Sequence, residues 1–330
     1  FSAGMGIGLL FFGSYEPLHF FLNTPPGFSA TPGSPEAMNA AIGQTLLHWG
    51  PFAWSFYALV GGAIAYSAYR RGRSPLISAI FTPIFNERLA MPLGRVIDTF
   101  AILVTLFGTA VSGVKRGNRI LSNINMVVAL ILALFVFIAG PTLFLLDFIP
   151  SALVAFVGGL PAMLSVSASS STEAAAFMES WTTYYWAWWV SWTPFVGMFI
   201  ARISRGRTLR EFVTVVIMIP SIVCLLWFSI MGGTSMWMEM NGAEISAAQS
   251  SQEYLFRVLD NLPFTALASV VAMFSLTIFF VTSADSASLV MATTSQSGKS
   301  NPDKKLTVVW GVSLSAVAIT LLVAGGEETV

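Results

Sequence analysis

Residues 181–210 read WTTYYWAWWVSWTPFVGMFIARISRGRTLR. The stretch begins with an apolar, aromatic run over residues 181–201 and ends in a cluster of arginines at positions 202, 205, 207 and 210. Because a helix rises about 1.5 Å per residue, about 20 apolar residues cross the hydrocarbon core of a bilayer. Basic clusters that follow such runs are typical of cytoplasmic loops. The stretch therefore predicts a membrane-spanning helix that ends on the cytoplasmic side.

The composition extends this interpretation to the whole chain. Of its 330 residues, 55% are hydrophobic and only 10% are charged, too few charges to cover a water-soluble surface. The net charge is +0, and the basic residues form short clusters between apolar runs rather than one stripe. The composition therefore favours membrane lipid as the surroundings and argues against nucleic acid as a partner.

Further apolar runs predict an all-α polytopic membrane protein. The candidate spans are residues 1–22, 46–68, 97–113, 122–146, 181–201, 212–232, 262–291 and 306–325. Residues 147–180 carry Glu173, Glu179 and several serines but no Lys or Arg, and we expect them to form an external amphipathic helix and loop. Only the run 97–113 separates the Arg70 cluster from the Lys115 cluster, so this one short span has a basic loop at each end, which does not fit the pattern of basic loops on the cytoplasmic side. Either this run is re-entrant, or a span is missing near Ser112 and Gly113.

Aromatic residues gather on two of these spans and form the first candidate site. Trp49, Trp54 and Tyr57 lie on one span, and a second group of tryptophans, 186, 188, 189 and 192, lies on another. Rings on facing helices can hold a quaternary ammonium by cation–π interaction, worth about 0.5–2 kcal/mol per well-placed ring. The alternative is the interfacial belt in which Trp and Tyr anchor the ends of membrane helices.

Glycines and hydroxyls form two further candidates. Gly4, Gly6 and Gly8 alternate within an apolar run, which suits an unwound membrane helix whose backbone contacts a ligand, although such glycines also permit close helix packing. Hydroxyls and one carboxylate cluster between Thr282 and Ser288, and Thr105 lies one helical turn from Thr109. Hydroxyl and free carbonyl oxygens suit sodium, whereas a lone hydroxyl more often bonds within its own helix.

No pattern of catalytic residues accompanies these candidates. The chain has two histidines, His19 and His48, and one cysteine, Cys224, with no metal-binding spacing among them. Paired carboxylates or an activated serine at plausible spacing are also lacking. We therefore expect no enzyme and no organic cofactor.

Five stretches together resemble the betaine/choline/carnitine transporter (BCCT) family. They are FSAGMGIG (1–8), HWGPFAWSFY (48–57), WAWWVSWTP (186–194), ARISRGRTLREF (201–212) and TSADSAS (282–288). The resemblance implies a LeuT-like transporter core of two inverted five-helix repeats, truncated at both ends and lacking about one helix internally. The implied divisions are residues 1–146 for the first repeat, 147–180 for the external segment and 181–330 for the second repeat. Family members usually assemble as homotrimers.

The resemblance also implies roles for individual residues. By this resemblance, the aromatic box that holds the ammonium head would consist of Trp49, Trp54, Tyr57 and Trp189. Trp188 and Trp192 would line the path beside it. The backbone of Ala3, Gly4, Met5 and Gly6 would face the solute carboxylate. One sodium site would use the carbonyls of Ser2, Met5 and Phe279 and the hydroxyls of Thr282 and Ser283, and a second would use Thr105, Thr109 and the Phe195 ring.

The function that this resemblance implies is import of a trimethylammonium solute, glycine betaine first, by sodium symport across the bacterial plasma membrane. Gly8 stands where choline carriers of the family often have an acidic residue, which favours a zwitterion. Carriers of choline, carnitine or another betaine are alternatives within the family. A membrane protein that binds or senses the same solute without carrying it is the alternative from another class.

Overall fold

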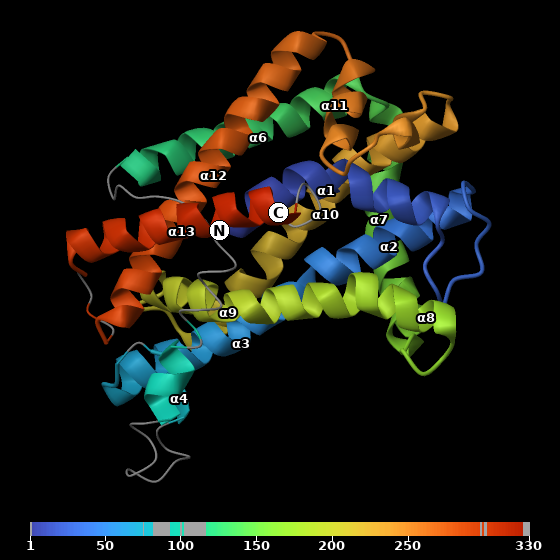
Figure 1. Cartoon of the computed structure of the whole chain (residues 1–330). Helices are drawn as coiled ribbons and strands as arrows, with labels where there is room; N and C mark the ends of the chain where they lie inside the picture. Colours follow the sequence, from blue (N-terminus) through green and yellow to red (C-terminus); the bar gives the residue numbers. More distant parts are fainter. Residues whose placement is uncertain are drawn as a thin grey trace.

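The structure is a bundle of helices. The computed structural model describes residues 2–74, 76–81, 93–99, 101, 117–297, 299 and 302–325, and no strand occurs in these ranges (Figure 1). The prediction of an all-α chain is confirmed. The helical elements are α1 (Ser2–Leu22), α2 (Pro35–Trp49), α3 (Pro51–Ala65), the π-turn η1 (Tyr66–Arg70), α4 (Ser78–Phe81), α6 (Gly117–Ala139), α7 (Thr142–Ser165), α8 (Thr172–Phe177), the π-turn η2 (Met178–Thr182), α9 (Thr183–Ile203), α10 (Leu209–Met240), the 3₁₀ turn η3 (Ile245–Ala247), α11 (Glu253–Asp260), α12 (Thr265–Ser295) and α13 (Lys304–Gly325).

Seven of the predicted spans coincide with helices, and two of those seven are interrupted. The run 46–68 breaks at Gly50 and Pro51, where α2 ends and α3 begins. The run 122–146 breaks at Gly140 and Pro141, between α6 and α7. A proline ring cannot donate a backbone hydrogen bond, and proline is favoured where a helix begins. The run 97–113 lies almost wholly outside the described residues, so its re-entrant or spanning character stays a prediction.

Within the described residues, four helical segments are long and apolar enough to cross a bilayer. They are Leu121–Ala139, Thr142–Ser165, Leu209–Met240 and Thr265–Ser295. The second lies in α7, which begins earlier than the external segment expected from residue 147. Figure 1 shows α7 running steeply across α2 rather than along it, and the two helices meet where Gly43 of α2 faces Ala155 of α7. That α7 lies outside the bilayer stays a prediction.

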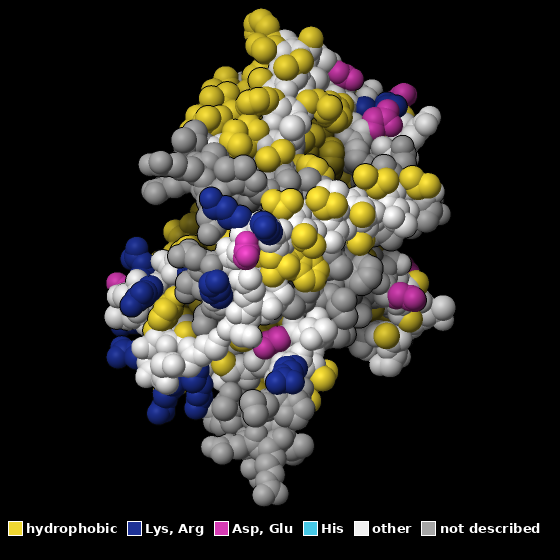
Figure 2. Space-filling view, turned by 60° about the vertical axis from the view of Figure 1, so that its left-hand side comes forward, with side chains coloured by type: hydrophobic (Ala, Val, Ile, Leu, Met, Phe, Trp, Pro, Cys, Tyr) yellow, Lys and Arg dark blue, Asp and Glu magenta, His cyan; other side chains and the backbone are white. Residues whose placement is uncertain are grey.

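The two ends of the bundle differ in charge. At one end the Arg205 guanidinium lies 5.7 Å from the centre of the Tyr69 ring, and the Ser74 hydroxyl donates to the Ser297 carbonyl at 3.4 Å. These contacts bring three basic loops together, and Figure 2 shows Lys and Arg gathered on the left and lower left of the molecule. At the other end the loop between α1 and α2 packs on α7, with the Phe28 ring against Gly159. The segregation supports a membrane orientation with the basic end in the cytoplasm.

Close helix contacts hold the centre of the bundle. α3 and α9 meet at Gly61 and Gly197, where a Cβ on Gly61 would lie 3.2 Å from the Gly197 carbonyl oxygen. α1 and α10 meet where the Pro17 ring fills the space beside Gly232. Small residues let backbones approach in this way, and dispersion contacts then stabilise the pair. Together with α2, these helices surround a core of buried aromatic side chains.

Candidate aromatic binding site

The four predicted box rings meet in the centre of the bundle. Trp49 comes from α2, Trp54 and Tyr57 from α3, and Trp189 from α9, and all four are buried. Ring centres are 5.3 Å apart for Trp49 and Trp189, 6.2 Å for Tyr57 and Trp189, and 5.5 Å for Trp54 and Tyr57. The planes of these pairs are inclined by 76°, 83° and 66°. Rings at such distances and angles are in edge-to-face contact with each other, and because they are buried they do not face lipid.

The break between α2 and α3 orients two of the indoles. The last carbonyls of a helix have no donor within the helix, so they need partners elsewhere. The Trp189 indole donates to the His48 carbonyl at 2.8 Å, and the Trp54 indole donates to the Trp49 carbonyl at 3.2 Å. Gly50 permits this geometry, because a Cβ there would lie 2.4 Å from the Leu46 carbonyl oxygen. The end of α2 therefore fixes rings that belong to α3 and α9.

Trp188 and Trp192 extend the aromatic surface beside the four rings, and their role in a path stays a prediction. The Trp188 ring stacks on Trp189 with centres 4.9 Å apart, and it meets Trp192 at 6.4 Å. Both tryptophans are only half-buried. Gly8 of α1 faces this group, and a Cβ on Gly8 would lie 2.7 Å from Cη2 of Trp49. α1 can therefore pack directly on the aromatic cluster, because Gly8 has no side chain.

The glycine-rich segment differs from the expectation. The backbone is α-helical from Ser2 onward, through Gly4, Gly6 and Gly8, so the prediction of an unwound segment is wrong for this structure. Neighbouring rings occupy the space that glycine side chains leave empty: a Cβ on Gly6 would lie 2.1 Å from the Phe279 ring. The side chains of Ala3 and Met5 lie outside the described residues, and the contact of Ala3, Gly4, Met5 and Gly6 with a carboxylate stays a prediction.

The residues of the first sodium site are partly brought together. Phe279 of α12 lies against Gly6 of α1. The buried Thr282 hydroxyl donates to the carbonyls of Ile278 at 2.8 Å and Phe279 at 3.2 Å, which is the bonding within a helix that the alternative reading expected. The side chains of Ser2, Ser283 and Asp285 lie outside the described residues. Sodium binding here stays a prediction.

The second sodium site is described only at Phe195. Thr105 and Thr109 lie outside the described residues. Phe195 is buried among Ala287, Met291 and Leu314 of α12 and α13, and its ring meets Trp192 at 6.1 Å. The ring therefore lies at the junction of three helices, beside the aromatic path.

Sequence reasoning missed a buried polar cluster beside the box. Glu16 of α1 accepts from His48 Nδ1 at 2.7 Å, from Trp49 Nε1 at 2.7 Å and from the Tyr185 hydroxyl at 2.5 Å. On the other side of the imidazole, His48 Nε2 lies 3.0 Å from Gln44 Nε2 and 3.1 Å from Thr182 Oγ1. The available signal was a single carboxylate within an apolar span, which marks a functional candidate in a membrane protein.

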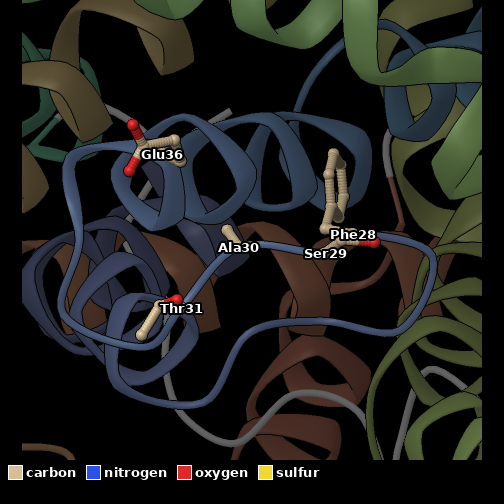
Figure 3. A pocket seen from close by; sticks show the side chains of 5 residues that line it. All are labelled: Phe28, Ser29, Ala30, Thr31 and Glu36. Carbon is tan, nitrogen blue, oxygen red and sulfur yellow. The ribbon is translucent and has the colours of Figure 1, made fainter.

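Two surface hollows lie apart from the aromatic rings. A hollow of about 410 Å³ follows the loop between α1 and α2 and is lined by Phe28, Ser29, Ala30, Thr31 and Glu36 (Figure 3). A second, of about 380 Å³, lies at the basic end, where Arg70, Arg205 and Arg207 surround it. Neither hollow includes a predicted site residue, so the aromatic cluster stays the candidate site.

Comparison with known proteins decides the family. The model of the betaine/carnitine/choline family transporter matches residues 1–112 and 109–330. The chain belongs to the BCCT family. This BCCT chain is 43% identical to the betaine/ectoine transporter LcoP of Corynebacterium glutamicum, over 99% of its own length and 59% of that of LcoP. It is 36% identical to the glycine betaine transporter OpuD of Bacillus subtilis, over 99% of its own length and 72% of that of OpuD. It is therefore an integral membrane protein of a transporter family rather than an enzyme.

The BCCT chain is discontinuous relative to these proteins. The two matched pieces meet at residues 109–112, and the alignment with LcoP has 372 positions, 42 more than the 330 residues of the chain. At least those 42 positions have no residue here, enough for one membrane helix of about 20 residues and its loops. The junction of the two matched pieces lies where the sequence predicts either a re-entrant run or a span missing near Ser112 and Gly113. The chain spans about three fifths of the length of LcoP.

Proposed function

We propose that the chain binds a solute with a trimethylammonium head, glycine betaine first, among Trp49, Trp54, Tyr57 and Trp189. The observation that carries this proposal is the meeting of these four buried rings from three helices, because the electron-rich face of an aromatic ring attracts a cation. The names of the relatives add support, since LcoP is a betaine/ectoine transporter and OpuD a glycine betaine transporter. Hydrophobic walls would accept the methyl groups, which cannot form strong hydrogen bonds.

Binding tests this proposal directly. Replacing Trp189 by leucine removes the ring that contacts both Trp49 and Tyr57, so radiolabelled glycine betaine should bind the purified chain about 2- to 30-fold more weakly. Trp237→Leu is the matched control, because Trp237 lies on α10 with 36% of its side chain exposed and should leave the affinity unchanged. Equal loss in both variants, or absence of binding by the unmodified chain, would contradict the proposal.

The same proposal includes transport by sodium symport across the plasma membrane, with homotrimers as the assembly. Its support is the meeting of α1 and α12 at Gly6 and Phe279, one turn from the buried Thr282 hydroxyl. Carbonyl and hydroxyl oxygens at such a junction suit sodium. Accumulation of solute in proteoliposomes should require an inward sodium gradient. Binding without accumulation would favour the alternative function of a membrane binding or sensing protein.

A hydroxyl deletion tests the sodium site separately. Thr282→Ala should raise severalfold the sodium concentration that supports half-maximal binding of the solute, because one oxygen ligand is lost. Thr277→Ala is the control on the same helix, since the exposed Thr277 hydroxyl only donates to the Met273 carbonyl at 2.9 Å. A sodium requirement that is the same in both variants would exclude Thr282 as a ligand.

A further inference from the structure

The buried carboxylate of Glu16 has no Lys or Arg within ion-pair distance in the part of the chain that the structure describes, and its one basic partner is His48. Its bonds come from His48, Trp49 and Tyr185, and both Glu16 and His48 are fully buried. These donors belong to α2 and α9, so the carboxylate joins three helices. A buried carboxylate costs free energy unless donors and a nearby positive charge compensate it.

The partners of Glu16 come from both sides of the bundle centre. His48 Nε2 lies 3.0 Å from the Gln44 amide group and 3.1 Å from the Thr182 hydroxyl. His48 bonds to Glu16 through its other ring nitrogen, Nδ1, at 2.7 Å. The Trp49 indole can only donate, and the Tyr185 hydroxyl donates as well. With a proton on His48 Nδ1, all three partners present donors to the Glu16 carboxylate.

Trp49 connects this negative charge to the candidate site. Its indole N–H donates to Glu16 Oε2, and its ring forms a wall of the aromatic box, 5.3 Å from Trp189. A hydrogen bond from the N–H to a carboxylate raises the electron density of the indole, and attraction of a cation depends on that density. A charge in a buried, weakly polar environment also acts over a longer distance than one in water.

We propose that Glu16 is the counter-charge for the positive head of the solute and acts through the Trp49 indole. This inference rests on the proposed function, because it requires a cationic head in the aromatic box. Glu16 itself would not touch the solute. It would determine specificity for a charged head over an uncharged group of the same shape, and the bound cation would in turn stabilise the buried carboxylate.

A purely structural role is the competing interpretation, since Glu16 joins α1, α2 and α9. The two roles differ in their effect on charge selectivity. Choline and its uncharged analogue 3,3-dimethylbutan-1-ol have the same shape around the head, so the ratio of their affinities measures how strongly the site prefers positive charge. Loss of packing lowers both affinities together, whereas loss of a counter-charge lowers only the affinity for the cation.

The experiment measures that ratio for the purified full chain and its variants by calorimetric titration. Glu16→Gln keeps the shape but removes the charge, and we expect the preference for choline to fall at least about fivefold with the affinity for the neutral analogue nearly unchanged. Tyr185→Phe is the matched control, because it removes one hydrogen bond to the same carboxylate oxygen and keeps the charge. The preference of Tyr185→Phe for choline over the neutral analogue should stay within about twofold of that of the unmodified chain.

A second neutral variant guards against misfolding. In Glu16→Gln three donors face an amide, whereas Glu16→Gln combined with Tyr185→Phe leaves one donor fewer. Its preference for choline should be at least about fivefold below that of Tyr185→Phe alone. An unchanged preference in a folded neutral variant, or loss of folding in both neutral variants while Tyr185→Phe folds, would overturn the inference. Failure of the unmodified chain to bind choline and glycine betaine alike would instead contradict the proposed function, whereas binding of glycine betaine with no measurable binding of choline would count against Glu16 as a counter-charge.

Discussion

Trp49 is held from two directions. Its indole donates to Glu16, and its ring touches Trp189, Trp188 and Tyr185. The side of the ring that faces α1 meets Gly8, so position 8 decides how closely that helix can approach. At this point a single methyl group would change the geometry of the site, because the ring has neighbours on its other sides.

Gly8→Ala should therefore weaken solute binding. The added Cβ would lie 2.7 Å from Cη2 of Trp49 and 3.6 Å from Cη2 of Trp188, and the ring must move to relieve the first contact. Overpacking of this kind costs about 1–3 kcal/mol, so we expect thermal stability to fall together with affinity. Gly158→Ala is the control, since open space surrounds Gly158 on α7. Binding and melting temperature in detergent measure both effects, and unchanged binding in Gly8→Ala would contradict the contact.

The rings of the box could be predicted from sequence, whereas the partners of Glu16 could not. Tryptophans at helical spacing within membrane spans are visible as a pattern, and the family resemblance gave their roles. The donors to Glu16 lie at positions 48, 49 and 185, so only the packing of α1 against α2 and α9 brings them together. A carboxylate within an apolar span marks position 16 as a candidate, but partners that lie 32 to 169 residues away leave no local signal of the cluster.

At the scale of elements, the break between α2 and α3 turns the end of one helix into part of the site. The HWGPF stretch contains the signal for a break, because glycine commonly follows a helix and proline commonly begins one. A search for long apolar runs misses it, since the hydropathy continues through both helices. In α1 the sequence predicted a break that the structure does not have. The glycines suggested unwinding, but the helix continues, and rings from α2 and α12 fill the spaces beside Gly6 and Gly8.

Gly50→Ala tests the importance of the break. A Cβ at position 50 would lie 2.4 Å from the backbone oxygen of Leu46, so the junction must rearrange. The carbonyls of His48 and Trp49 would then lose their alignment with the indoles of Trp189 and Trp54. We expect a lower melting temperature and weaker binding of glycine betaine, with Gly158→Ala again unaffected. A variant with the binding and stability of the unmodified chain would show that the junction does not orient the rings.

At the scale of the whole molecule, charge separates the two ends of the bundle. The loops near Tyr69, Arg205 and Ser297 meet at the basic end, and the loop before α2 lies at the other. Basic clusters, apolar runs and acidic loops made this polarity predictable from sequence. The order in which helices pack was not, because nearly all apolar faces in such a chain resemble each other.

Labelling of intact cells checks the orientation. Cys224 is buried, so the chain carries a cysteine that should react slowly, and Cys224→Ser removes it entirely. In that background, a membrane-impermeant maleimide should label Thr31→Cys and leave Ser74→Cys unlabelled until the cells are opened. Both positions are exposed in the structure. The opposite pattern would invert the assigned orientation.

The meeting of Gly61 and Gly197 has a consequence for how a carrier could release its solute. The backbones of α3 and α9 touch there, so Tyr57 and Trp189 keep the 6.2 Å between their ring centres only as long as the two helices stay together. In a carrier of the proposed kind that moved this pair as one body, the same two rings would meet the head group from either side of the membrane. Release would then depend on the helices that move against the pair.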